Sequence, residues 1–100
     1  MSDTPPVVLI NPFIVPEGKV DEAIAAWEVS RDFLAEQPGY ISTKLHQSLA
    51  TDAQYQLINV AVWSSPEAFK AATAAMRASG VFPPVEGVEV APALYHVVRE

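Results

Sequence analysis

The spacing of apolar residues changes along the chain and predicts alternating strands and helices. Val7–Val15 is β-branched and almost continuously apolar, which is typical of a strand buried on both faces. Pro12 cannot donate a ladder hydrogen bond, so we expect an irregularity or a locally unpaired edge there. From Val20 the spacing becomes helical, with one stripe made of Val20, Ala23, Ile24, Trp27, Arg31 and Leu34. Gln37-Pro38-Gly39 ends this helix, because a proline disfavours helical geometry in the residue before it.

Two further strands, Tyr40–Leu49 and Tyr55–Trp63, are predicted by period-two alternation, with Ala50–Gln54 as the hairpin loop. In the first, one face is expected to carry Ile41, Thr43, Leu45 and Leu49, and the other Tyr40, Ser42, Lys44 and His46. In the second, one face carries Tyr55, Leu57, Asn59, Ala61 and Trp63, and the other Ile58, Val60 and Val62.

A second helix is predicted to begin at Ser64–Glu67, where Ser64 and Glu67 fit a capping box and a proline stands in the first turn. Good helix formers continue to Ala78, and Gly80 is expected to end the helix as a left-handed cap. Phe69, Ala72 and Met76 would share its apolar side. After a rigid connector at Val81–Pro84, Val88–Val98 is predicted to form the last strand.

This order of elements predicts an α+β fold of the ferredoxin-like βαββαβ type, a four-stranded antiparallel sheet with both helices on one face. The opposite face would then be aliphatic, with Val8, Ile10, Ile14, Ile58, Val60 and Val62. Exposure of such a face is a liability. We therefore expect a homodimer in which two sheets face each other.

The composition places the chain among small globular domains. One hundred residues, half of them apolar, predict a single domain at 7–100, preceded by a flexible tail at 1–6 that is polar and proline-rich. Because there is no cysteine, disulfides, zinc-thiolate sites and thiol nucleophiles are excluded. The net charge of −6 argues against a nucleic-acid or anionic-membrane partner. With no signal peptide or membrane-spanning segment in the sequence, we expect a cytoplasmic location.

Common catalytic motifs are missing from the sequence. There is no glycine-rich phosphate loop and no metal-ligand spacing, and the only histidines are His46 and His96. We therefore expect neither a metal nor a nucleotide or flavin cofactor.

Polar residues within apolar strands are the remaining candidates for a site. Asn11 and Asn59 interrupt strands predicted to be neighbours, and a buried amide needs a hydrogen-bond partner. Each asparagine could instead make a strand-end or bulge hydrogen bond.

The third predicted strand would bring Asn59 together with Tyr55 and Trp63 on one face. His46, on the neighbouring strand, could reach the same pocket as a proton acceptor, or it could face solvent at the sheet edge. Trp63 and Trp27 could equally belong to the core.

Several segments together resemble the antibiotic biosynthesis monooxygenase domain. They are Leu9–Phe13, Pro16–Lys19 leading into the helix with Trp27, Gln37–Ser48 and Asn59–Phe69, and the resemblance runs from about Val7 to Ala78. It implies the dimeric α/β barrel fold and oxygenation of aromatic phenols by dioxygen without metal or flavin. It also implies that Asn59 and Trp63 form part of the pocket. The tyrosine and arginine partners of the polyketide oxygenases have no clear counterparts, with Arg77 the nearest candidate.

A haem-degrading branch of the family shares an asparagine that matches Asn11, but its axial histidine follows the second helix. Glu86 stands at about that place here. The resemblance therefore disfavours haem degradation and leaves quinone-type monooxygenation open.

Two functions of different classes follow. The first is a cofactor-independent monooxygenase acting on a small aromatic phenol, quinol or polyketide-like compound, with dioxygen as co-substrate. Its catalytic residues would be Asn59, Trp63 and His46, and its substrate-binding residues would be Asn11, Trp27, Tyr55, Phe69 and Phe82. The second is a non-catalytic module that binds a hydrophobic metabolite or a partner protein.

Overall fold

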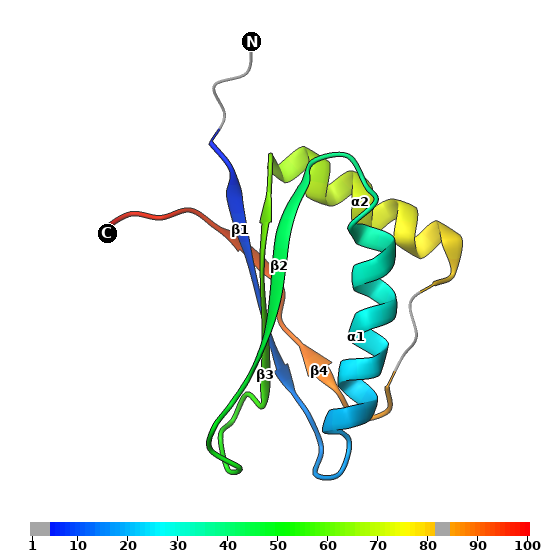
Figure 1. Cartoon of the computed structure of the whole chain (residues 1–100), viewed down its shortest axis with the longest axis vertical. Helices are drawn as coiled ribbons and strands as arrows, with labels where there is room; N and C mark the ends of the chain where they lie inside the picture. Colours follow the sequence, from blue (N-terminus) through cyan, green and yellow to red (C-terminus); the bar gives the residue numbers. More distant parts are fainter. Residues whose placement is uncertain (1–4, 82–84) are drawn as a thin grey trace.

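The computed structural model describes residues 5–81 and 85–100, and its elements follow the predicted order (Figure 1). The elements are β1 (Val7–Ile14), α1 (Val20–Leu34), β2 (Tyr40–Gln47), β3 (Leu57–Trp63), α2 (Pro66–Ser79), β4 (Glu89–Val90) and β5 (Ala93–Tyr95). Neither helix of the described chain has the length and apolarity that a bilayer crossing requires.

The sheet is antiparallel, with the order β2-β3-β1-β4 and with β5 also paired to β1. Both helices lie on the same side of this sheet (Figure 1). The prediction of a ferredoxin-like α+β fold is confirmed by this arrangement. Adjacent placement of β1 and β3 also brings Asn11 and Asn59 opposite each other as cross-strand partners.

Alternation along β3 separates the two faces of the sheet. Leu57, Asn59, Ala61 and Trp63 are buried beneath the helices, whereas Ile58, Val60 and Val62 are only half-buried on the other side. The register pairs Val62 with Val8 and Val60 with Ile10. We call Val8, Ile10, Ile58, Val60 and Val62 the outer face, and in the described chain no helix covers it (Figure 1).

The core lies between the inner face and the helices, as two clusters. One is built on Leu9, Ala61, Trp63 and Ala72, and the other on Phe13, Val15, Ala23 and Leu57. From the predicted stripe of α1, Ala23 is buried, and Ile24, Trp27 and Leu34 pack against these clusters. From α2, Ala72 and Met76 are buried as the spacing predicts.

The caps of α2 explain where this helix begins and ends. The N-cap is Ser65, not Ser64, because the Ser65 hydroxyl accepts a hydrogen bond from the Ala68 N–H at 3.1 Å. At the other end Gly80 adopts φ 72°, the left-handed conformation that was expected there.

The alternation predicted for β2 is wrong at its first residue. The register slips between Tyr40 and Ser42, so that Tyr40 pairs with Trp63 and Ser42 with Val62. An extra residue in one strand moves the residues before it to the opposite face. Tyr40 therefore joins the inner face, while Lys44 and His46 lie with Val60 and Ile58 on the outer face.

The hairpin loop between β2 and β3 is longer than predicted, running from residue 48 to residue 56. The Gln56 side chain donates to the carbonyls of Ala50, Thr51 and Ala53, and the Gln56 carbonyl accepts from the Ser48 N–H. These bonds close the loop before the ladder begins at Leu57. Tyr55 is therefore a loop residue, and its predicted place in the strand is wrong.

The predicted strand Val88–Val98 is interrupted. Val90 pairs with Phe13 and Ala93 with Ile10, and the two residues between them leave the ladder opposite Asn11 and Pro12. The Ala91 N–H donates instead to the Pro12 carbonyl and to Asn11 Oδ1, each at 3.2 Å. The irregularity expected at Pro12 is thus present, as a break between β4 and β5. Residues 1–4 of the predicted tail lie outside the described residues.

Candidate functional site

A cavity of about 780 Å³ lies between the inner face of the sheet and the two helices. That volume is within the range typical of small-molecule sites. Leu9, Phe13, Ala61, Leu34 and Met76 supply apolar walls, and residues after α2, including Val85 and Val88, close one side. The polar groups of the cavity are therefore few, and their positions decide what it can bind.

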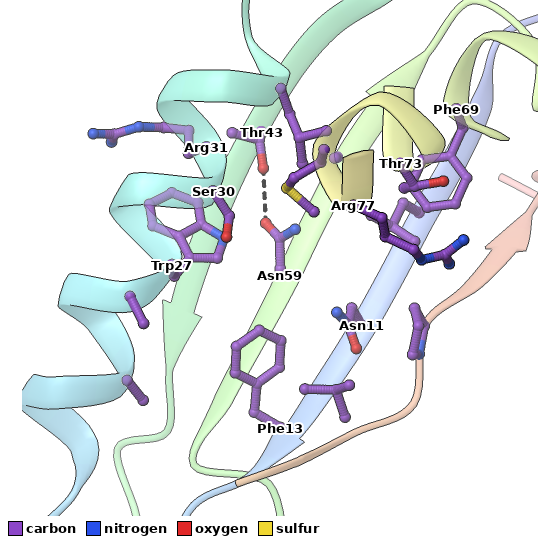
Figure 2. A pocket seen from close by; sticks show the side chains of 18 of the residues that line it. Asn11, Phe13, Trp27, Ser30, Arg31, Thr43, Asn59, Phe69, Thr73 and Arg77 are labelled. Atoms are coloured by element: carbon purple, nitrogen blue, oxygen red, sulfur yellow. Dashed lines mark hydrogen bonds between the residues drawn. The ribbon is translucent and has the colours of Figure 1, made fainter. Parts of the chain in front are cut away.

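Asn59 lies at the centre of the cavity, on β3 (Figure 2). It is 9% exposed, and its Oδ1 accepts a hydrogen bond from the Thr43 hydroxyl at 2.7 Å. Thr43 comes from β2, beside β3 in the sheet. This bond uses the oxygen end of the amide and leaves the nitrogen end on the side away from Thr43 (Figure 2).

Asn11 faces the same cavity from β1 (Figure 2). Its Oδ1 accepts the Ala91 N–H in the gap between β4 and β5. The bulge-type hydrogen bond that the sequence left open as an alternative is therefore present. Asn11 also lines the cavity, so the structural and the site interpretation apply to the same side chain.

Trp63 forms the centre of an aromatic cluster at one end of the cavity. Its ring meets Tyr40 edge-on with centroids 5.6 Å apart, and Phe69 of α2 with centroids 5.7 Å apart. Only 1% of Trp63 is exposed, and its indole N–H is buried without an acceptor in the described part of the chain.

Two arginines line the cavity from the helices. The Arg31 guanidinium lies 5.1 Å from the Trp27 ring centroid and also pairs with Glu28 and Asp32 of its own helix. Arg77 comes from α2, and its guanidinium makes no hydrogen bond or ion pair with any described residue. Arg77 is an exposed residue at the cavity edge, and no carboxylate of the described residues is paired with it.

No carboxylate, imidazole, amine or thiol occurs among the described lining residues. Likewise, nowhere in residues 5–81 and 85–100 do three histidine, cysteine or acidic side chains gather as a metal site would require. The polar chemistry that the described cavity offers is hydrogen-bond donation from amide and guanidinium groups, together with the hydroxyls of Ser30, Thr43, Thr73 and Tyr40, which can donate or accept.

The structure brings together five of the predicted site residues. They are Asn11, Trp27, Asn59, Trp63 and Phe69, and all of them line the cavity. Phe82 lies outside the described residues.

Two predicted site residues are not in the cavity. His46 pairs with Ile58 on the outer face, where its Nδ1 lies 3.3 Å from the Ile58 carbonyl oxygen, so its expected approach to the pocket is wrong. It contributes only to a shallow depression between β2 and α1. Tyr55 is 39% exposed in the hairpin loop and does not line the cavity either.

Thr43 and Tyr40 are lining residues that sequence reasoning missed. Thr43 is expected on this face from alternation, but without a role. Thr43 could have been found in the same way as Asn59, because both are hydrogen-bonding side chains in an otherwise apolar row of a strand. Tyr40 has no such signal, because its face depends on the register slip.

Comparison with known proteins identifies the family. The model of the antibiotic biosynthesis monooxygenase family matches residues 6–78. The structure of a candidate monooxygenase from Shewanella loihica PV-4 superimposes with a TM-score of 0.91 at 50% identity, covering 99% of this chain and 100% of that one. No curated protein matches the sequence.

More distant structures share the fold. SnoaB, a cofactor-independent oxygenase from Streptomyces nogalater, has a TM-score of 0.75 at 21% identity, with 96% of each chain covered. The heme-degrader MhuD from Mycobacterium tuberculosis has a TM-score of 0.72 at 24% identity, covering 94% of this chain and 97% of its own. The family match over most of the sequence and the half-identical relative agree, and the chain belongs to the antibiotic biosynthesis monooxygenase family.

Proposed function

We propose that this chain is a cofactor-independent monooxygenase that oxidises a small aromatic phenol, quinol or polyketide-like compound with dioxygen. The observation that carries the proposal is the cavity itself, a largely apolar chamber with the Thr43-bonded Asn59 amide among its few polar groups. SnoaB, of the same fold, is described as a cofactor-independent oxygenase, which supports the reaction class.

The chemistry requires an electron-rich substrate. The substrate first loses a proton to water, since no described lining residue is a carboxylate or imidazole. The resulting phenolate, or carbanion of an anthrone-like ring system, gives one electron to dioxygen. The substrate radical and superoxide combine as a peroxide anion, which takes a proton back from water to become a hydroperoxide. Loss of water from a hydroperoxide on a ring CH₂ leaves a carbonyl, so one oxygen atom ends in the product and the other in water. Donors aimed at the ring oxygen stabilise its growing negative charge. Asn59 is suited to this role, and Trp63 supplies a flat wall for the ring.

Haem is not the substrate class that we propose. No histidine lines the described part of the cavity, and Glu86, expected near the position of an axial ligand, is exposed and is not a lining residue. A tricyclic aromatic compound is small enough to enter a cavity of about 780 Å³ and needs no axial ligand.

We further propose that the working form is a homodimer joined through the outer face. The proposal is supported by the aliphatic side chains that no helix of the described chain covers. A second copy would cover them with an identical surface, as the commonest oligomer symmetry requires.

The experiment is an oxygen-consumption screen over anthrones, naphthols and quinols, with a chelator present. With ¹⁸O₂, the product of a CH₂ substrate should carry one labelled oxygen. Asn59→Ala should lower turnover about 10²–10³-fold, the usual effect of removing one such donor. Gln54→Ala, in the exposed loop, is the control and should retain wild-type turnover.

Two results would count against the proposal. Full activity in Asn59→Ala, with only the thermal midpoint lowered, would make Asn59 a structural residue. Binding of these compounds without oxygen uptake would instead indicate a binding module for hydrophobic metabolites.

A further inference from the structure

The Asn59 amide is held at one end only. Its Oδ1 accepts from the Thr43 hydroxyl at 2.7 Å, and no described residue accepts a hydrogen bond from its Nδ2. In a side chain that is 9% exposed, two N–H donors without a partner are costly unless a ligand or water uses them. A hydroxyl can also accept, but the Thr43 proton has no other acceptor among the described residues, so this orientation of the amide satisfies that proton whereas the reversed one would not.

The Asn11 amide is held in the same way, with its oxygen bonded within the protein. It is the cross-strand partner of Asn59, and its Oδ1 is taken by the Ala91 N–H at 3.2 Å. The oxygen ends of both amides are thus engaged within the protein. A ligand in the cavity meets their nitrogen ends side by side, from two adjacent strands.

Other groups around the cavity also favour a ligand that accepts hydrogen bonds. The Arg31 and Arg77 guanidiniums, which line the cavity, can only donate hydrogen bonds. Thr73, one turn before Arg77 on α2, already donates its hydroxyl proton to the Lys70 carbonyl. Among the described lining residues there is no carboxylate or imidazole to take a proton from a ligand.

We infer that Thr43 is a positioning residue, whose hydroxyl fixes the Asn59 amide with its N–H side toward the cavity, and that the cavity consequently selects the deprotonated form of an enolic or phenolic ligand. This rests on the proposed function only in taking the cavity as the ligand site. Hydrogen bonds to a charged oxygen are about twice as strong as those to a neutral one. Among the described lining side chains, a neutral hydroxyl could donate only to uncharged oxygens such as the hydroxyls of Ser30 and Tyr40, whereas an anion can accept from both amides.

Without the Thr43 hydroxyl, the amide loses the partner that defines its orientation. It can rotate by half a turn and present Oδ1 to the ligand, where it would repel an anion and accept from a neutral hydroxyl. Thr43→Val removes the hydroxyl and keeps the branched shape, whereas Thr43→Ser keeps the hydroxyl. Comparison of these two variants separates the effect of amide orientation from the effect of side-chain packing on β2.

The test uses 2,6-dihydroxyanthraquinone, whose absorption reports ionisation and whose hydroxyls lie too far from the ring carbonyls to form an internal hydrogen bond. Its neutral and anionic forms are titrated against the protein across pH. We expect wild type and Thr43→Ser to bind the anion at least about tenfold more tightly than the neutral form, equivalent to lowering the pKa of the bound compound by about one unit. In Thr43→Val the ratio of the affinity for the anion to the affinity for the neutral form should fall close to one. Affinity for 2,6-dimethoxyanthraquinone, which cannot ionise, should change much less than affinity for the anion, because hydrogen bonds to neutral oxygens are weaker.

Equal affinity of wild type for both forms, or no binding of the dihydroxy compound at any pH, would overturn the inference. A preference retained in Thr43→Val would overturn the role of Thr43, and Thr43→Ala serves the same comparison if the valine variant does not fold. Because the compound is already oxidised, the measurement does not depend on turnover. A preference for the anion without oxygen uptake in the screen would defeat the proposed reaction and leave this inference standing.

Discussion

At the scale of single residues, β3 supplies both the core and the polar centre of the cavity. Trp63 is almost fully buried and packs edge-on against Tyr40 and Phe69, yet its indole N–H has no acceptor in the described part of the chain. An unsatisfied buried donor costs about 1–3 kcal/mol. The aromatic ring therefore stabilises the fold while its N–H works against it, unless a ligand accepts the hydrogen bond.

Two substitutions of Trp63 separate these contributions. Trp63→Ala removes the ring and should lower the free energy of unfolding by about 3–5 kcal/mol. Trp63→Phe should cost clearly less, because a smaller volume is lost and the unpartnered donor disappears. Urea unfolding followed by circular dichroism measures both variants. Equal losses would mean that the indole N–H contributes to stability and has a partner after all.

The residues of the site differ in how well the sequence predicts them. Asn59 and Asn11 could be found because an amide in an apolar strand needs a partner, and both have one. His46 could not be placed correctly. It pairs with Ile58, next to Asn59 in the sequence, but its side chain lies on the opposite face of the sheet. Period-two alternation defines two faces for each strand, but only the pairing register decides which of them meets the helices.

At the scale of elements, the close approach between the start of β2 and the start of α2 sets the register of the inner face. The Gly39 carbonyl accepts from the Ser64 N–H at 2.8 Å, and a Cβ on Gly39 would lie 2.7 Å from the Ser64 hydroxyl oxygen and overlap Ala68. The turn at Pro38-Gly39 is visible in the sequence. The register slip that follows it is not, because it depends on how β3 and α2 meet this turn.

Alanine at Gly39 should therefore be more costly than alanine at Gly18. Both glycines have positive φ, 89° and 83°, so each variant should lose about 1–2 kcal/mol from backbone strain. A Cβ on Gly18 would meet no described atom within 4 Å beyond its chain neighbours, whereas Gly39→Ala should lose about 1–3 kcal/mol more from overlap with α2. Chemical denaturation of the two variants measures the difference. Equal stabilities would show that α2 does not approach the turn as closely as described.

At the scale of the whole molecule, the sequence predicts the fold well because the order of elements leaves few topologies. Short connections and neighbouring strands restrict a βαββαβ chain to a small set of arrangements, and the observed sheet order is the ferredoxin-like one. Pro12 likewise indicates an irregularity by its chemistry alone, and the last strand breaks opposite it. The proposed covering of the outer face by a second copy is different, since the order of elements within one chain does not determine it.

Val60→Asp tests that partner, because Val60 is at the middle of the outer face, between Ile10 and Lys44 in the register. In a single chain the new carboxylate would lie across from the Lys44 ammonium and remain in water, so the fold should persist. In a dimer joined through this face, both copies would bury it, which is costly. Sedimentation at micromolar concentration should therefore give twice the chain mass of 10.8 kDa for wild type and the single mass for Val60→Asp, with unchanged circular dichroism.

Leu49→Asp, at a fully exposed loop position, is the matched control and should sediment as wild type does. A wild-type protein that sediments as a single chain would refute the dimer.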